Sequence, residues 1–163
     1  MIQLQKVLDF IHQYEILLFL VYVLLSLISA FIIDKIFITT LKKIVKKTKS
    51  DIDDKLIDVL HPAIYNTILY LGFYVALSAI TIPGKIEFIL QGLLKSLIVI
   101  YWSLGIFKSF MIVVNWVSKK DNEKSFIKKK TVPLFDNLGK IVIFLFSIYF
   151  VMLCWGVNVT AWI

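Results

Sequence analysis

Four long apolar stretches dominate this sequence and constrain its fold more than any other feature. Three of them contain no Asp, Glu, Lys or Arg: residues 16–33, 63–82 and 141–163. The fourth, residues 88–117, is interrupted only by Lys95 and Lys108. A helix needs about 20 apolar residues to cross a hydrocarbon core of roughly 30 Å, and the alternation typical of membrane β-strands is not seen. We therefore predict an all-α integral membrane protein with four transmembrane helices, at about 16–40, 63–82, 87–117 and 138–160.

The composition excludes several other classes of protein. Hydrophobic residues make up 60% of the 163 residues and charged residues 18%, whereas soluble domains average about 45–50% and a quarter. The mean hydropathy of +0.87 is too high for a soluble enzyme or a disordered chain of this size. The single cysteine, Cys154, cannot form a disulfide within the chain.

The basic residues predict the orientation of the helices. All 18 are lysines, against 11 acidic residues, for a net charge of +7. Lysines crowd two segments between apolar stretches, whereas the opposite side carries only Lys6 and Lys85. By the positive-inside rule, we expect both segments in the cytoplasm, both termini outside, and a location in the cell (inner) membrane. Without arginine and without one basic face, nucleic-acid binding is not expected. The crowded lysines are Lys42, Lys43, Lys46, Lys47, Lys49 and Lys55, then Lys119, Lys120, Lys124, Lys128, Lys129 and Lys130.

The first cytoplasmic linker, residues 42–62, is predicted to contain an amphipathic helix. Ser50 and Asp53 resemble a capping box that starts this helix, and Pro62 is expected to end or bend it. The second linker, residues 118–136, is basic and contains Pro133. The stretch before the first span fits either a short interfacial helix or an extension of the span.

No catalytic, cofactor or metal site is predicted, and the chain is not expected to be an enzyme. His12 and His61 are placed near opposite membrane faces, so they cannot share a metal ion. The carboxylates Asp51, Asp53 and Asp54 fit stabilisation of a helix N-terminus better than a cation site. Lys95 and Lys108 are predicted to snorkel to the two boundaries rather than to form an ion pathway.

Small residues predict where the helices pack, because they let backbones approach closely in lipid. Ser26 and Ala30 mark the first span and Gly105 and Ser109 the third. The second span carries the largest set, namely Gly72, Ala76 and Ala79. The fourth is bulky and is expected to pack more loosely.

The lysines also have a potential mechanical use. Each lysine near an anionic leaflet contributes about 1 kcal/mol of attraction. Two clusters would pin a helical paddle to the headgroups, and the paddle would tilt when membrane tension increases the available area. The residues assigned to this anchoring are Lys42, Lys43, Lys46, Lys47, Lys128, Lys129 and Lys130.

Residues 47–57 (KTKSDIDDKLI), 132–141 (VPLFDNLGKI) and 155–161 (WGVNVTA) together resemble the small-conductance mechanosensitive channel family (MscS-like). They are similar to a linker between the first spans, to the run into the helix before the pore, and to the outer corner before the pore. The resemblance covers roughly residues 41–163 and makes Pro133 and Gly156 expected bend points.

The resemblance implies the tension-sensing region of a homoheptameric channel that opens under hypo-osmotic stress, with membrane lipids as partners. The family's pore helix and cytoplasmic domain would follow Ile163, so we expect this chain to be part of a longer protein. Two alternatives stay open. One is a small transporter or channel complete in itself, and the other is a non-conducting membrane scaffold.

Overall fold

The computed structural model describes residues 2–45, 51–119 and 128–157, with side chains over 14–40, 52–119 and 128–157. These residues form four long helices and one short turn of 3₁₀-helix. The helices are α1 (Ile2–Val45), α2 (Asp51–Leu77), α3 (Gly84–Lys119) and α4 (Val132–Cys154), and the 3₁₀ turn η1 (Lys129–Thr131) directly precedes α4.

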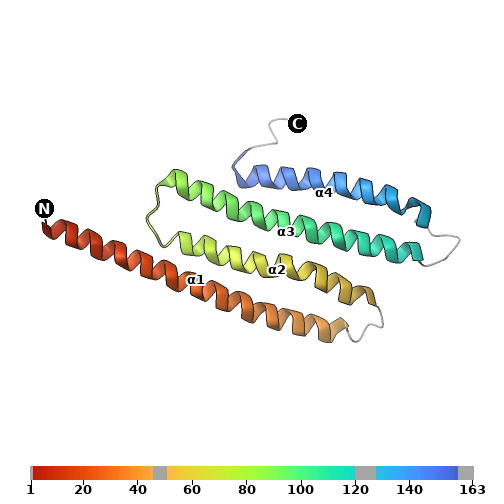
Figure 1. The fold of residues 1–163 in the computed structure, drawn as a ribbon, viewed down its shortest axis with the longest axis horizontal. Coiled ribbons are helices and arrows are strands. Elements are labelled where there is room, and N and C mark those ends of the chain that lie inside the picture. Colours follow the sequence, from red (N-terminus) through yellow and green to blue (C-terminus); the bar gives the residue numbers. More distant parts are fainter. Residues whose placement is uncertain (1, 46–50, 120–127, 158–163) are drawn as a thin grey trace.

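The helices lie side by side in one antiparallel layer, in the order α1, α2, α3, α4 (Figure 1). Within the described residues, each long helix packs only on its neighbours in the chain. The surface area of 12273 Å² reflects this openness, because a compact monomer of 18.9 kDa exposes roughly 8,300 Å². The fold is therefore a flat array, not a closed bundle.

The prediction of an all-α membrane protein with four spanning helices is confirmed. Each of the four helices contains a segment long and apolar enough to cross a membrane. Large apolar side chains are exposed on all of them, for example Phe31 on α1, Leu71 on α2, Leu104 on α3 and Phe144 on α4. Exposed apolar side chains are unfavourable in water but not in the hydrocarbon of a membrane. Their exposure therefore fits a protein surrounded by lipid.

Three helices differ from the predicted boundaries. The fourth, α4 (Val132–Cys154), begins and ends six residues before the predicted span of about 138–160, so its first residues fall in the predicted linker. The first span and the stretch before it form one continuous helix from Ile2, which is the extension alternative. The second span and the N-terminal part of α2 are also continuous, so the described residues contain no separate linker helix. Pro62 lies inside α2 without ending it. A helix in lipid tolerates proline because neighbouring groups compensate for the lost backbone hydrogen bond.

The antiparallel order brings the helix ends that flank the two lysine-rich segments to one end of the layer, called here the lysine-rich end. The C-terminal ends of α1 and α3 lie at the same end as the N-terminal ends of α2 and α4 (Figure 1). At the opposite end, Glu15 of α1 accepts hydrogen bonds from the backbone N–H and hydroxyl of Thr81, at 3.2 and 2.7 Å. This contact fixes the turn between α2 and α3 against α1.

Candidate functional site

The lysine-rich end is the first candidate site. Lys42 and Lys43 lie in the last turn of α1, but their side chains are outside the described residues, as are Lys46 and Lys47 entirely. The other three predicted anchoring lysines, Lys128, Lys129 and Lys130, lie in and before η1 with exposed side chains.

The 3₁₀ turn η1 fixes the backbone that carries the last three of these lysines. Thr131 donates its backbone N–H and its hydroxyl to the Lys128 carbonyl, both at 2.8 Å. The Lys128 N–H in turn donates to Thr131 Oγ1 at 3.0 Å. These bonds hold the turn in place, and the three lysines that it carries are exposed at the end of the layer, where anionic headgroups can bind them.

The other predicted site residues are distributed along the helices. Ser50 lies outside the described residues, so the cap it was predicted to form with Asp53 is not described. Pro62 is in α2, where Asn66 Nδ2 donates to its carbonyl at 2.7 Å. Pro133 lies in the first turn of α4, a position where proline's missing N–H costs nothing.

Gly156 forms the C-terminal cap of α4. Its φ of +70° is in the left-handed region, which glycine reaches without a Cβ clash. The Gly156 N–H donates to the Leu153 carbonyl and the Val157 N–H to the Met152 carbonyl, both at 3.0 Å. These two bonds form a Schellman motif, so the chain leaves the helix axis directly after Trp155.

Small residues line the contact between α1 and α2. Ala30 and Ala76 are completely buried, and Ser26 is nearly so. Gly72 of α2 lies so close to Ser26 that a Cβ at Gly72 would overlap the Ser26 side chain. Ser26 Oγ donates to the Val23 carbonyl of its own helix at 2.8 Å. The contact therefore depends on close backbone approach rather than on a hydrogen bond between the helices.

Aromatic and polar contacts join α2 to α3. Trp102 Nε1 donates to Thr67 Oγ1 at 2.9 Å. Lys95, one of the two lysines in the third span, places its Nζ 5.0 Å from the ring centroid of Tyr74. A cation–π contact of this kind holds an ammonium group next to the aromatic face. Lys95 and Lys108 both have exposed side chains, and their snorkelling stays a prediction.

The contact between α3 and α4 is held by serine and tryptophan side chains. Ser147 Oγ lies 2.6 Å from Ser103 Oγ, and Trp155 Nε1 donates to Ser96 Oγ at 3.0 Å. The Trp155 ring lies directly over Gly92, where an added Cβ would be 3.3 Å from it. Two apolar grooves of about 410 and 360 Å³ flank the Ser103–Ser147 contact.

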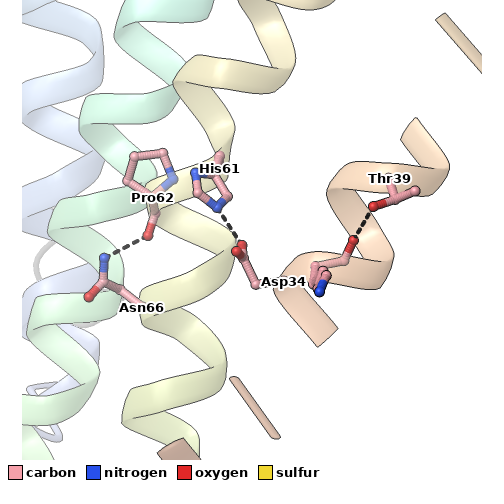
Figure 2. Close-up of polar contacts among 6 residues, drawn as sticks. Asp34, Thr39, His61, Pro62 and Asn66 are labelled. Carbon is pink, nitrogen blue, oxygen red and sulfur yellow. Dashed lines mark hydrogen bonds and ion pairs between the residues drawn. The ribbon is translucent and has the colours of Figure 1, made fainter. Parts of the chain in front are cut away.

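An ionisable pair joins α1 to α2 nearer the lysine-rich end. Asp34 Oδ1 of α1 contacts His61 Nε2 of α2, as Figure 2 shows. These two atoms are almost fully covered, although the side chains as a whole are 22% and 38% exposed. Thr40 ends the apolar segment of α1 six residues beyond Asp34, or about 9 Å along the helix. Asp34 therefore lies inside the predicted first span, and His61 lies just before the predicted second span, within the candidate spanning segment Ile52–Leu77 of α2.

A groove of about 310 Å³ opens beside this pair. Its polar lining comes from Lys35, Thr39 and Asp58 in addition to the pair itself, and its apolar lining from Phe31 and Ile38. Thr39 Oγ1 donates to the Lys35 carbonyl at 2.6 Å. The groove thus brings side chains of both charge signs together beside the pair.

Sequence reasoning missed this pair, because Asp34 was assigned to the end of the first span and His61 to the linker. Their distances along the sequence from the α1–α2 connection could have predicted the contact. Asp34 and His61 are almost equally far from the connection between α1 and α2, and antiparallel helices place such positions opposite each other. Ser26 and Gly72 obey the same relation.

The described residues contain no group of three His, Cys, Asp or Glu side chains placed to hold a metal ion. Comparisons with protein-family models, with curated proteins and with solved structures find no match to this chain. The function is therefore inferred from the arrangement of the helices and their charged groups.

Proposed function

We propose that this chain is the tension-sensing transmembrane region of a mechanosensitive ion channel of the MscS-like family, active in hypo-osmotic stress. The observation that supports the proposal best is the single layer of helices. Each long helix is held only by its chain neighbours within the described residues, and apolar side chains on all four helices face outward. Such an array has a large lipid contact for its mass.

A flat array responds to tension through its area. Stretching the bilayer lowers the free energy of any conformation that occupies more membrane area. In a closed bundle, spreading the helices would break contacts to several neighbours at once. Among the described residues, spreading or tilting changes three interfaces between long helices, whose buried residues are few and mostly small. The array is therefore the softer arrangement of the two.

Lysine anchoring gives the array a fixed end. Lys128, Lys129 and Lys130 are exposed at the end of the layer that also carries the C-terminal end of α1. Each would contribute about 1 kcal/mol of attraction to an anionic leaflet. When the bilayer thins under tension, anchored ends follow the headgroups and the helices tilt.

The proposal extends to location and assembly. The lysine-rich end faces the cytoplasm of the inner membrane by the positive-inside rule, and the opposite end of the layer faces out. The chain works as part of a homo-oligomer, a heptamer in the family it resembles, with membrane lipids as its main partners. It is not an enzyme.

Distance measurements under tension test this proposal. Spin labels are attached to the variants Ile28→Cys in α1 and Ile148→Cys in α4, in a Cys154→Ser background. Both positions are exposed, and three helix spacings of 8–10 Å put them roughly 24–30 Å apart. The chain is reconstituted in unilamellar vesicles, and the label distance is measured before and after hypo-osmotic swelling. We expect the distance distribution to move on swelling.

A matched pair within α3, Ile89→Cys with Leu104→Cys, controls for effects of swelling on the labels. Both side chains are exposed, and a single helix keeps their separation constant. An α1–α4 distance that stays as constant as the α3 control in swollen vesicles would rule out tension sensing by this layer. Tension-activated currents from the 163-residue chain alone in patch-clamp recordings would favour the self-contained channel instead.

A further inference from the structure

We propose that the apolar groove on one side of the α3–α4 contact binds one anionic phospholipid, whose phosphate is held by Lys108 and Lys140. The inference needs only a membrane around the layer and does not rest on tension sensing. It starts from a difference between the two grooves that flank the Ser103–Ser147 contact.

The two grooves are similar in size but differ in charge. The first, of about 410 Å³, is lined on α4 by Lys140, Ile141 and Phe144 and on α3 by Leu104 and Phe107. The second, of about 360 Å³, has no charged side chain among the described residues that line it. Both volumes fall in the usual range of ligand pockets, about 300–1,000 Å³. Lys140 therefore gives the first groove a cationic group that the second lacks.

Lys108 brings a second ammonium group to the same place. Gly139, directly before Lys140, lies against Phe107, where an added Cβ would be 3.7 Å from the ring. Lys108 and Lys140 therefore come from the same level of two adjacent helices. Lys108 also follows the groove residue Leu104 by four positions, which puts both on one side of α3. Both lysines are exposed, so a ligand in the groove can reach them.

Asp136 is the charged residue of α4 nearest to Lys140, and it uses part of the hydrogen-bonding capacity of that lysine. Lys140 Nζ donates to Asp136 Oδ2 at 2.7 Å. An ammonium group has three N–H donors, so this bond leaves two for phosphate oxygens. Two lysines and one carboxylate leave a net charge of +1, which matches the single negative charge of a lipid such as phosphatidylglycerol.

The groove runs from the two lysines into the apolar part of the layer. Lys140 directly precedes the uncharged residues 141–154 of α4, and charged residues at the end of an apolar run mark the headgroup region of a membrane. The lining continues from Lys140 to Ser147, or about 10 Å along the helix. A ligand in this groove therefore meets charge at one end and apolar side chains over the rest of its length.

A phospholipid fits this arrangement, and lipid surrounds the layer. Its phosphate accepts charge-assisted hydrogen bonds from the ammonium groups, and an acyl chain covers the exposed side chains of Leu104, Ile141 and Phe144. A zwitterionic lipid offers the same phosphate, but its own cationic group offsets the attraction of the lysines. The groove therefore prefers an anionic lipid from the leaflet at the lysine-rich end.

Fluorescence quenching at each groove tests the inference. Phe144→Cys, at the first groove, and Phe146→Cys, at the second, carry the fluorophore bimane in a Cys154→Ser background. Both side chains are exposed, and bimane is similar in size to the ring that it replaces. The full chain is reconstituted in vesicles at constant osmolarity, with phosphatidylglycerol or phosphatidylcholine that carries a quenching nitroxide on its acyl chain.

The quenching gives the relative binding constant of phosphatidylglycerol over phosphatidylcholine at each groove. We expect this ratio to be about fivefold higher at the first groove, the factor that one net positive charge contributes at about 1 kcal/mol. The second groove measures the enrichment of anionic lipid around the whole protein, so the comparison removes that effect.

Charge variants identify the groups that bind the lipid. Lys108→Gln combined with Lys140→Gln should abolish the difference between the grooves, and Asp136→Asn, which removes the negative charge, should increase it. Lys95→Gln changes the other lysine of the third span, which lines neither groove, and should leave the difference intact. If the double variant does not fold, Asp136→Asn carries the test.

Three results would overturn the inference. The first is an equal lipid preference at both grooves of the wild-type chain, and the second is a difference that survives in the double variant. The third is displacement of phosphatidylglycerol by inorganic phosphate at matched ionic strength, because a site that needs the acyl chain does not bind free phosphate in its place. Constant osmolarity separates each of these results from failure of the tension proposal.

Discussion

Gly72 of α2 packs directly against the Ser26 side chain of α1, leaving no room for a Cβ between the two helices. We expect Gly72→Ala to destabilise the chain by about 1–3 kcal/mol, the usual cost of overpacking a close contact. This loss outweighs the gain of up to about 1 kcal/mol in helix propensity. Reversible unfolding in detergent, followed by circular dichroism, measures the difference.

Two variants control that experiment. Gly84→Ala places a Cβ where no atom lies within 4 Å, so it should be neutral or slightly stabilising. Ser26→Gly combined with Gly72→Ala moves the Cβ from one helix to the other and should recover most of the lost stability. Equal stability of Gly72→Ala and Gly84→Ala would show that the close contact contributes nothing.

The α1–α2 contact also shows how far the sequence predicts this structure. Apolar stretches of about 20 residues or more, three of them uncharged, were enough to predict four spanning helices, since only a helix satisfies its backbone in hydrocarbon. The small residues Ser26, Ala30, Gly72 and Ala76 were correctly predicted as contact positions, because two helix backbones approach closely only where the side chains between them are small.

The features that sequence reasoning missed depend on register and on context. The Asp34–His61 pair forms only when α1 and α2 are aligned as an antiparallel hairpin. The apolar pattern of a single helix does not predict how two helices are aligned. Pro62 was expected to end or bend a linker helix; α2 continues through it, so it does not end the helix, and the bend stays a prediction. Neighbouring helices can support the backbone around a proline in a membrane helix.

The cap at the end of α4 gives a second prediction. Gly156 has a φ of +70°, and a residue with a Cβ in this region raises the conformational free energy by roughly 1–2 kcal/mol. We expect Gly156→Ala to disrupt the last turn of α4 and to raise hydrogen exchange in residues 151–157 about tenfold, with little change in the centre of the helix. Gly84→Ala serves as control, and unchanged exchange in both variants would contradict this role of Gly156.

The serine contact between α3 and α4 gives a third prediction. Ser103 and Ser147 hydroxyl oxygens are 2.6 Å apart, and each also has a carbonyl acceptor in its own helix. We expect their coupling in a double-mutant cycle with Ser103→Ala and Ser147→Ala to be only about 0.6 kcal/mol, as for other hydrogen bonds between membrane helices. Unfolding free energies of the four chains measure it, and a coupling above about 2 kcal/mol would contradict the prediction.

The lysines in and directly before η1 give the last prediction. Lys128, Lys129 and Lys130 are exposed at one end of the layer, and each should attract anionic lipid by about 1 kcal/mol. We expect Lys128→Gln, Lys129→Gln and Lys130→Gln together to lower the preference of the protein for spin-labelled phosphatidylserine over phosphatidylcholine, measured by electron spin resonance at low salt. Raising the salt concentration should reduce the wild-type preference in the same direction. Lys85→Gln, at the opposite end of the layer, is the matched control. A loss in Lys85→Gln as large as the triple variant's loss per removed charge would mean that the overall charge, not the position of these lysines, sets the preference for anionic lipid.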